Sequence, residues 1–193
     1  MKRLSHTATT PLCVVIAGLA LGIIYLRHLM LPFAWEAEQL LIRETGILAF
    51  TLFSASFLCT PIRQVAKRLG HKPPLHAWRR SLGLTSTLAA LCHLLVSYRL
   101  HLVDTPIFGA WFQPYAQAGV AALLLLLALS ITSFPKLTRH LKVRHWKTLH
   151  RLIFVIFFLL LLHIILGPHL PSNTMLTLLF ILAVVSWTGR LNP

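Results

Sequence analysis

Long apolar runs alternate with short, basic connections along the 193 residues of this chain. Several runs reach the roughly 17–25 residues that an α-helix needs to cross the hydrocarbon core of a membrane. Only helices and closed barrels satisfy their backbone hydrogen bonds in lipid, so runs of this length predict membrane-spanning helices. The pattern predicts six helices, at about 8–26, 43–60, 81–98, 115–134, 150–166 and 173–189.

Prolines mark the ends of two of these runs. We expect the second helix to stop at Pro61 and the fourth at Pro135, because proline lacks the amide hydrogen that a helix uses. The first run follows two basic residues, which is also typical of a cleaved signal peptide, but no small-residue cleavage site follows it. We therefore expect a retained first helix and an all-α polytopic membrane protein.

The composition excludes a soluble domain. Hydrophobic residues make up 56% of the chain and charged residues only 11%, whereas soluble domains carry about 25% charged residues. The net charge of +14 would suggest a nucleic-acid partner in a soluble protein, so the placement of the charges decides its meaning.

The charges divide between the two sides of the predicted membrane. With a cytoplasmic N-terminus, fifteen of the 18 basic residues fall on the inner side, namely Lys2, Arg3, Arg63, Lys67, Arg68, Lys72, Arg79, Arg80, Lys136, Arg139, Lys142, Arg144, Lys147, Arg151 and Arg190. The outer side holds the other three and every acidic residue, namely Arg27, Arg43, Arg99, Glu36, Glu38, Glu44 and Asp104. The positive-inside rule predicts this asymmetry. We expect a multi-pass membrane protein with both termini cytoplasmic, in contact with anionic lipid and without a nucleic-acid partner.

Two histidines lie well inside predicted spans, where ionisable groups are costly and indicate function. His93 lies 13 residues after Arg80, and His163 lies 12 residues after Arg151. At 1.5 Å per residue these steps are about 20 and 18 Å from the cytoplasmic side. Because both helices run outward, we expect the two imidazoles at nearly the same depth.

Two imidazoles at one depth predict the axial ligands of a b-type haem in a helix bundle. Two axial histidines leave no open position for oxygen, which suits electron transfer. The alternative for either histidine is a hydrogen bond to Ser or Thr of a neighbouring helix.

His150 is left undecided by its spacing. It precedes His163 by 13 residues, so on a straight helix their side chains point about 140° apart. An inner haem about 20 Å away would need His76, His140, His145 or another group as its second ligand. The alternative is an interfacial residue at the cytoplasmic rim.

The chain lacks the sequence motifs of hydrolases and nucleotide-binding domains. Electrons from NAD(P)H must therefore arrive through another protein or a bound flavin. The arginine clusters "RRSLG" and "KVRHWK" have the chemistry to bind haem propionates or a flavin phosphate, although topology alone also explains them.

Three segments carry a resemblance to a known family. They are "RETGILAFTLFSASFLCTPIRQVAKRLG", "RRSLGLTSTLAALCHLLVSY" and "LALSITSFPKLTRHLKVRHWKTLHRLIFVIFFLLLLHIILG". They resemble the MsrQ (YedZ) family, the haem-binding membrane subunits of bacterial MsrPQ methionine sulfoxide reductase systems, within the ferric-reductase-like transmembrane superfamily. The resemblance covers about residues 43–167, which we take as the core of one domain over residues 1–193.

The resemblance implies that His93, His150 and His163 are iron ligands of one or two haem b groups, with FMN as a further candidate cofactor. It implies electron flow from a cytosolic flavin reductase or quinone to a periplasmic, molybdopterin-containing MsrP-like reductase. That partner would carry out the catalytic reduction that repairs oxidised proteins, so the chain itself would be an electron-transfer subunit without catalytic residues.

Three other functions stay open at this point. The sequence departs from the family at "HLKVRHW" and at Phe154, where glycine and tyrosine are usual, so a transmembrane ferric reductase is one alternative. A proton-coupled carrier that uses His93 and His163 as a relay is another, although the spans lack the broken helices of such carriers. The third is a structural membrane anchor.

Overall fold

The computed structural model describes residues 6–30, 34–71, 74–104, 112–134 and 142–167, and every regular element in these ranges is a helix. The prediction of an all-α polytopic membrane protein is confirmed, since five stretches of these residues are long and apolar enough to cross a membrane. The sixth predicted helix, 173–189, lies outside the described residues. The chain divides into two compact units, Met1–Leu100 with Leu182–Pro193, and His101–Ile181.

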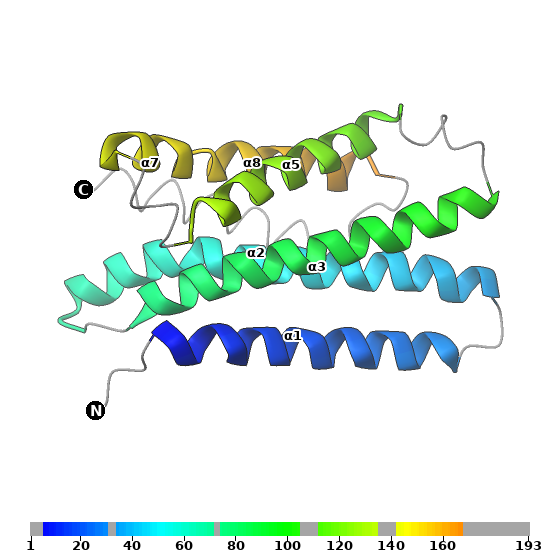
Figure 1. The fold of residues 1–193 in the computed structure, drawn as a ribbon, viewed down its shortest axis with the longest axis horizontal. Coiled ribbons are helices and arrows are strands. Elements are labelled where there is room, and N and C mark those ends of the chain that lie inside the picture. Colours follow the sequence, from blue (N-terminus) through cyan, green and yellow to red (C-terminus); the bar gives the residue numbers. More distant parts are fainter. Residues whose placement is uncertain (1–5, 31–33, 72–73, 105–111, 135–141, 168–193) are drawn as a thin grey trace. The chain divides into compact units, whose positions relative to one another are not determined.

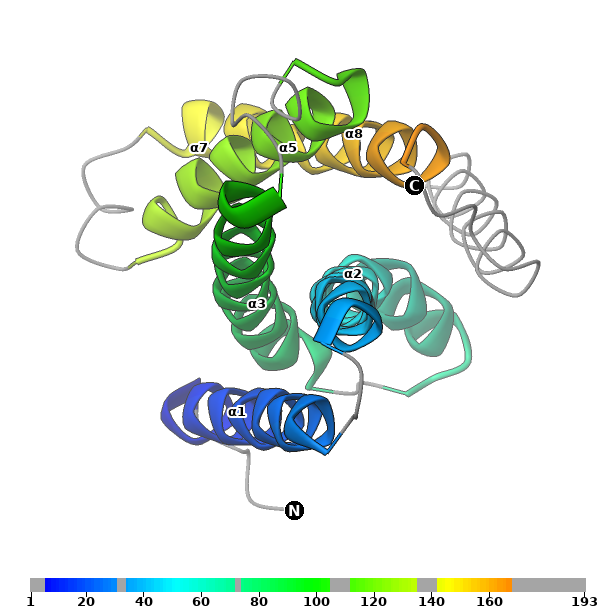
Figure 2. The same ribbon diagram turned by 90° about the vertical axis from the view of Figure 1, so that its right-hand side faces the viewer.

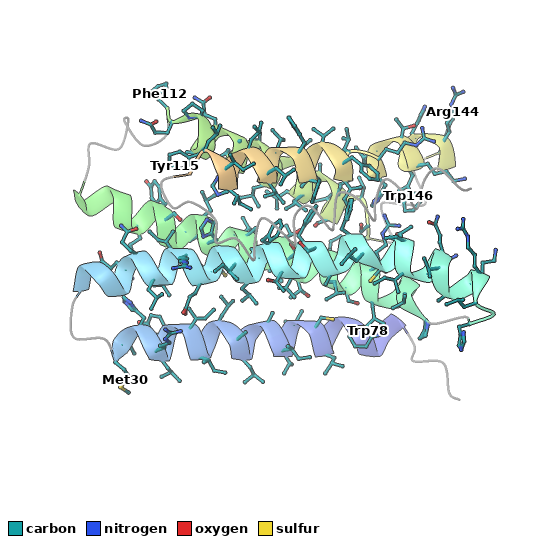
Figure 3. The ribbon with its side chains drawn as sticks, turned by 180° about the vertical axis from the view of Figure 1, so that it is seen from behind. Met30, Trp78, Phe112, Tyr115, Arg144 and Trp146 are labelled. Atoms are coloured by element: carbon teal, nitrogen blue, oxygen red, sulfur yellow. The ribbon has the colours of Figure 1, made fainter. Side chains whose placement is uncertain are left out.

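The first unit contains α1 (His6–Leu29), α2 (Ala34–Arg68) and most of α3 (Leu75–Asp104). Figure 1 shows α1 lying along α2, and Figure 2 shows α1, α2 and α3 nearly end-on. Successive helices alternate in direction, so the end of α2 and the start of α3 lie at the same end of the unit. At the opposite end, Arg27 of α1 forms an ion pair with Glu44 of α2; Met30 and Trp78 mark these two ends in Figure 3.

The prediction that the second span stops at Pro61 is wrong. Helix α2 continues through the buried Pro61 to Arg68. A proline inside a helix removes one hydrogen bond, and neighbouring helices compensate for it often enough that membrane helices tolerate the residue. Two residues after the end of α2 lies Gly70, whose φ of 79° only glycine adopts at no steric cost. The amide of His71 then donates to the carbonyl of Ala66 at 2.8 Å, as in a Schellman cap.

Three interhelical hydrogen bonds join α2 to α3 at regular steps of seven residues. They are His93 Nδ1 to the carbonyl of Ile42 at 3.1 Å, Ser86 Oγ to the carbonyl of Ala49 at 3.1 Å, and Ser56 Oγ to the carbonyl of Arg79 at 2.8 Å. A seven-residue repeat between two antiparallel helices is the packing of a left-handed coil. The contact that His93 makes therefore belongs to the same register of α3 on α2 as the contacts of Ser86 and Ser56.

The second unit contains α5 (Pro114–Ile131), α7 (Val143–His150) and α8 (Ile153–Ile165). Helix α5 packs along α8 (Figure 1). The buried apolar side chains of this pair are Ala118, Ala122, Leu123, Leu126 and Leu129 on α5, and Ile156 and Phe157 on α8. Helix α5 ends at Ile131 with Thr132 as its C-cap, so it stops before the predicted bound at Pro135.

Helix α8 lies within the fifth predicted span, 150–166, and the separate helix α7 precedes it. Helices α7 and α8 meet at Arg151 and Leu152, whose ψ angles of −20° and −12° are those of a 3₁₀ turn. The amides of Arg151, Leu152 and Phe154 each donate to the carbonyl three residues earlier. The chain therefore tightens for one turn immediately after His150.

Candidate functional site

His93 lies on α3 against the N-terminal part of α2. Its Nδ1 lies 3.1 Å from the carbonyl oxygen of Ile42 and 3.3 Å from the hydroxyl oxygen of Thr45. The Thr45 side chain is only 2% exposed, and its hydroxyl lies 2.8 Å from the carbonyl oxygen of Leu41. A hydrogen bond to a Ser or Thr of a neighbouring helix was the alternative role for His93, and Thr45 is a candidate partner for it. The carbonyl oxygen of Ile42, however, lies nearer to Nδ1 than the Thr45 hydroxyl does.

His163 lies in the last turn of α8 against the first turn of α5. Its Nδ1 lies 2.8 Å from the carbonyl oxygen of Tyr115, and the rings of the two residues are tilted with centroids 6.2 Å apart. Figure 3 shows Tyr115 at the start of α5, beside the end of α8. Ala122 lies seven residues after Tyr115 on α5, and Ile156 lies seven residues before His163 on α8; both are 0% exposed. The contact between His163 and Tyr115 thus continues the tightly packed interface of α5 and α8.

These contacts assign the tautomer of both imidazoles. A carbonyl oxygen only accepts hydrogen bonds, so the favourable form of each ring carries its hydrogen on Nδ1. The lone pair then belongs to Nε2, which is the usual form of a histidine that binds a metal, with the nitrogen behind it donating to a carbonyl. His93 and His163 therefore fit the donor chemistry of a haem iron through Nε2.

His150 ends α7, where its ring stacks on Trp146 one turn earlier, with centroids 4.4 Å apart. The Nε2 atom of His150 and the Nε1 atom of Trp146 are shielded from solvent, whereas His145 on the same helix is exposed. Figure 3 shows Trp146 and Arg144 leaving α7 on opposite sides. His150 is thus partly buried on the apolar side of α7.

The 3₁₀ turn changes the angle between His150 and His163. Each residue of a 3₁₀ turn advances by about 120° instead of the 100° of an α-helix. Two or three such steps add about 40–60°, so the separation falls from about 140° to about 80–100°. The turn brings His150 closer to the side of His163 than a straight helix would.

The structure assigns the three predicted histidines to two units: His93 to the first, and His150 and His163 to the second. Of the other proposed inner ligands, His145 is exposed, His140 lies outside the described residues, and nothing is described of the side chain of His76. Sequence reasoning found the imidazoles but not Thr45 or the carbonyl groups of Ile42 and Tyr115. Every residue carries a main-chain carbonyl, so the sequence does not show which carbonyl accepts a hydrogen bond.

The sequence pattern of the family described as "Ferric reductase like transmembrane component" matches residues 45–161, more than half of the chain. This chain belongs to the ferric-reductase-like transmembrane family. The match includes His93 and His150 and ends two residues before His163.

Curated relatives include haem-binding proteins. The "Protein-methionine-sulfoxide reductase heme-binding subunit MsrQ" of Cronobacter sakazakii is 37% identical over 124 residues, which are 62% of this chain and 59% of the relative. The protein of the same name from Polaromonas naphthalenivorans is 26% identical over 189 residues, 84% of this chain and 74% of the relative.

A third relative has a different name. The "Magnetosome protein MamZ" of Magnetospirillum gryphiswaldense is 32% identical over 131 residues, 66% of this chain but only 19% of the relative. The chain thus spans 59% of the C. sakazakii protein and a smaller share of this one. The family membership and the relatives' names support a membrane electron-transfer role with haem.

Proposed function

We propose that this chain is the haem-carrying electron-transfer subunit of a protein-methionine-sulfoxide reductase system in a bacterial inner membrane. The observation that carries the proposal is that Nδ1 of His93 and Nδ1 of His163 each lie within hydrogen-bond distance of a main-chain carbonyl, which favours the tautomer that binds a metal through Nε2. The relatives named as heme-binding subunits support the choice of haem as the metal group.

In this proposal His93 and His163 bind one haem, and His150 binds a second, inner one. Bound haem supplies a one-electron carrier. The residues of each unit would fix which nitrogen of the imidazole binds iron, and they pack each histidine against a neighbouring helix. The reduction of methionine sulfoxide belongs to a partner in this proposal.

The partners are those that the resemblance to the MsrQ family implies. Electrons enter on the cytoplasmic side from a flavin reductase or from quinone, and leave on the periplasmic side to a molybdopterin-containing reductase. The first unit supports this orientation, because the basic end of α2 and the start of α3 lie together at one end, while Glu44 lies at the other.

FMN is proposed as a further cofactor at the cytoplasmic side. Arg80 lies at the inner end of α3, and its Nε–H is buried without a hydrogen-bond acceptor among the described residues. A buried guanidinium hydrogen of this kind favours a phosphate or propionate group as its acceptor.

A ferric reductase is the second candidate, and the description of the family favours it. The two functions differ in the acceptor. Stopped-flow reoxidation of the prereduced protein by a ferric chelate and by an oxidised molybdopterin-containing reductase separates them. We expect fast reoxidation only by the protein partner.

The experiment that tests the haem proposal is a reduced-minus-oxidised visible spectrum of the detergent-purified protein with pyridine haemochrome quantification. We expect a low-spin b-type spectrum that is lost or becomes high-spin in His93→Ala and in His163→Ala. His71→Ala is the matched control, because this histidine is exposed and its Nδ1 contacts the carbonyl of Leu69, two residues earlier. A well-folded wild type without haem would contradict the proposal and favour a carrier or an anchor.

A further inference from the structure

Both membrane histidines lie over a glycine of the neighbouring helix, and the glycine has the same position in each case. His93 donates to the carbonyl of Ile42 and lies over Gly46. His163 donates to the carbonyl of Tyr115 and lies over Gly119. In both pairs the glycine follows the accepting carbonyl by four residues.

Helix geometry explains the spacing. The carbonyl of residue i accepts a hydrogen bond from the amide of residue i+4, and each Cα–Cβ bond tilts towards the start of the helix. A side chain at i+4 therefore covers the flank of that carbonyl. Glycine leaves the flank open, so the second lone pair of the carbonyl accepts a donor from another helix.

The imidazoles occupy the space that a Cβ would take. A Cβ at Gly119 would lie 2.7 Å from Nδ1 and 2.9 Å from Cε1 of His163. A Cβ at Gly46 would lie 3.1 Å from Cε1 and 3.3 Å from Nδ1 of His93. The first pair of distances is too short for any real contact, while the second requires a shift of a few tenths of an ångström.

Serine donors on the same helices show what the glycine adds. Ser56 donates to the carbonyl of Arg79 with Gly83 four residues on, but Ser86 donates to the carbonyl of Ala49 with the buried Phe53 four residues on. A short hydroxyl thus reaches a carbonyl with or without a glycine. A planar imidazole ring that lies flat on the helix has less freedom than a hydroxyl, and both imidazoles face a glycine at this position.

We propose that Gly46 and Gly119 are positioning residues for the iron-binding nitrogens of His93 and His163. Each glycine admits the imidazole to a carbonyl, which keeps the hydrogen on Nδ1, fixes the plane of the ring and makes Nε2 a stronger base. This inference rests on the proposed haem function. Groups that orient a metal-binding histidine in this way typically change metal affinity 10–100-fold when they are lost.

The test compares four alanine variants of the full-length, haem-loaded protein: Gly119→Ala, Gly46→Ala, Gly83→Ala and Gly22→Ala. Gly22 has nothing within 4 Å of its Cβ position, and Gly83 meets only the serine hydroxyl. The measurements are haem transfer to excess apomyoglobin, the low-spin electron paramagnetic resonance spectrum, and the haem reduction potential. Size-exclusion chromatography of each variant checks the fold.

We expect Gly119→Ala to speed haem release by about tenfold or more, to shift the resonance spectrum and to raise the potential, because a weaker base stabilises ferric iron less. Gly46→Ala, with the longer contacts, should change the same quantities in the same direction but less, and it keeps the proposal testable if Gly119→Ala does not fold. Gly22→Ala should match wild type in all three, and Gly83→Ala, which presses only on a serine hydroxyl, should change them less than Gly46→Ala does.

Three results would overturn the inference while leaving the haem function standing: unchanged spectra in both histidine-facing variants, equal effects in Gly83→Ala, or a fall in potential. The absence of haem from wild type itself would instead contradict the proposed function.

Discussion

The hydroxyl of Ser86 donates a hydrogen bond to the main-chain oxygen of Ala49 at 3.1 Å. This contact lies one heptad from the His93 contact on the same helix pair, so it holds the register in which the imidazole meets α2. A slip of α3 by one residue would turn the histidine by about 100° around its helix axis. The contact between His93 and α2 therefore depends on a serine two helical turns away.

Ser86→Ala removes this bond and should lower the stability of the helix pair by about 0.6 kcal/mol, with an upper bound of about 1.7 kcal/mol. Unfolding of the apoprotein in a mixed detergent series measures the change. Ser54→Ala is the matched control, because the Ser54 hydroxyl is buried with no hydrogen-bond partner among the described residues. Equal losses in both variants would mean that the Ser86 bond contributes nothing specific.

Thr45→Val tests the direction of the hydrogen bond at His93. If Nδ1 donates to the carbonyl of Ile42, as we infer, the hydroxyl of Thr45 is dispensable and the haem spectrum should stay that of wild type. If the hydroxyl instead donates to Nδ1, the valine variant should lose the ligand's tautomer and gain a high-spin component. Thr51→Val is the control, since that exposed hydroxyl donates to the carbonyl of Ile47, on its own helix.

Ala122→Leu should disturb the packed interface of α5 and α8 that holds His163. Ala122 has no exposed surface, and extra methylene groups in a packed interface cost about 1–3 kcal/mol. We expect lower thermal stability and a fraction of high-spin haem, as α5 moves away from α8. Leu124→Ala on the exposed face of α5 should leave both unchanged. A fully stable Ala122→Leu protein would show that the two helices pack less tightly than the structure has them.

His150→Ala decides the number of haems. If His150 binds an inner haem, the pyridine haemochrome ratio should fall from about two per protein to about one, and the spectrum of the remaining haem should be unchanged. His145→Ala, an exposed residue on the same helix, should keep the wild-type ratio. A wild-type ratio of one that His150→Ala does not alter would assign His150 to the rim of the membrane.

Much of the fold could be predicted from the sequence because lipid imposes one simple rule, that every backbone polar group must be satisfied within the segment. Apolar runs therefore marked the helices, while the direction that the basic residues indicate stays a prediction. The bounds were less predictable. Pro61 looks like a stop in the sequence, yet α2 continues to Arg68, because its neighbours stabilise a helix that local propensity would interrupt.

The candidate site, like the fold, could be predicted from the sequence only in part. Position within the apolar runs singled out His93 and His163, since an ionisable side chain is costly there and its place along a helix gives its depth. The sequence by itself thus determined the membrane class and the identity of the candidate ligands. The tertiary structure decided how those ligands are held: the carbonyls of Ile42 and Tyr115 and the open faces of Gly46 and Gly119. A backbone carbonyl is the same in every residue, so only the packing of one helix on another reveals which carbonyl a histidine meets.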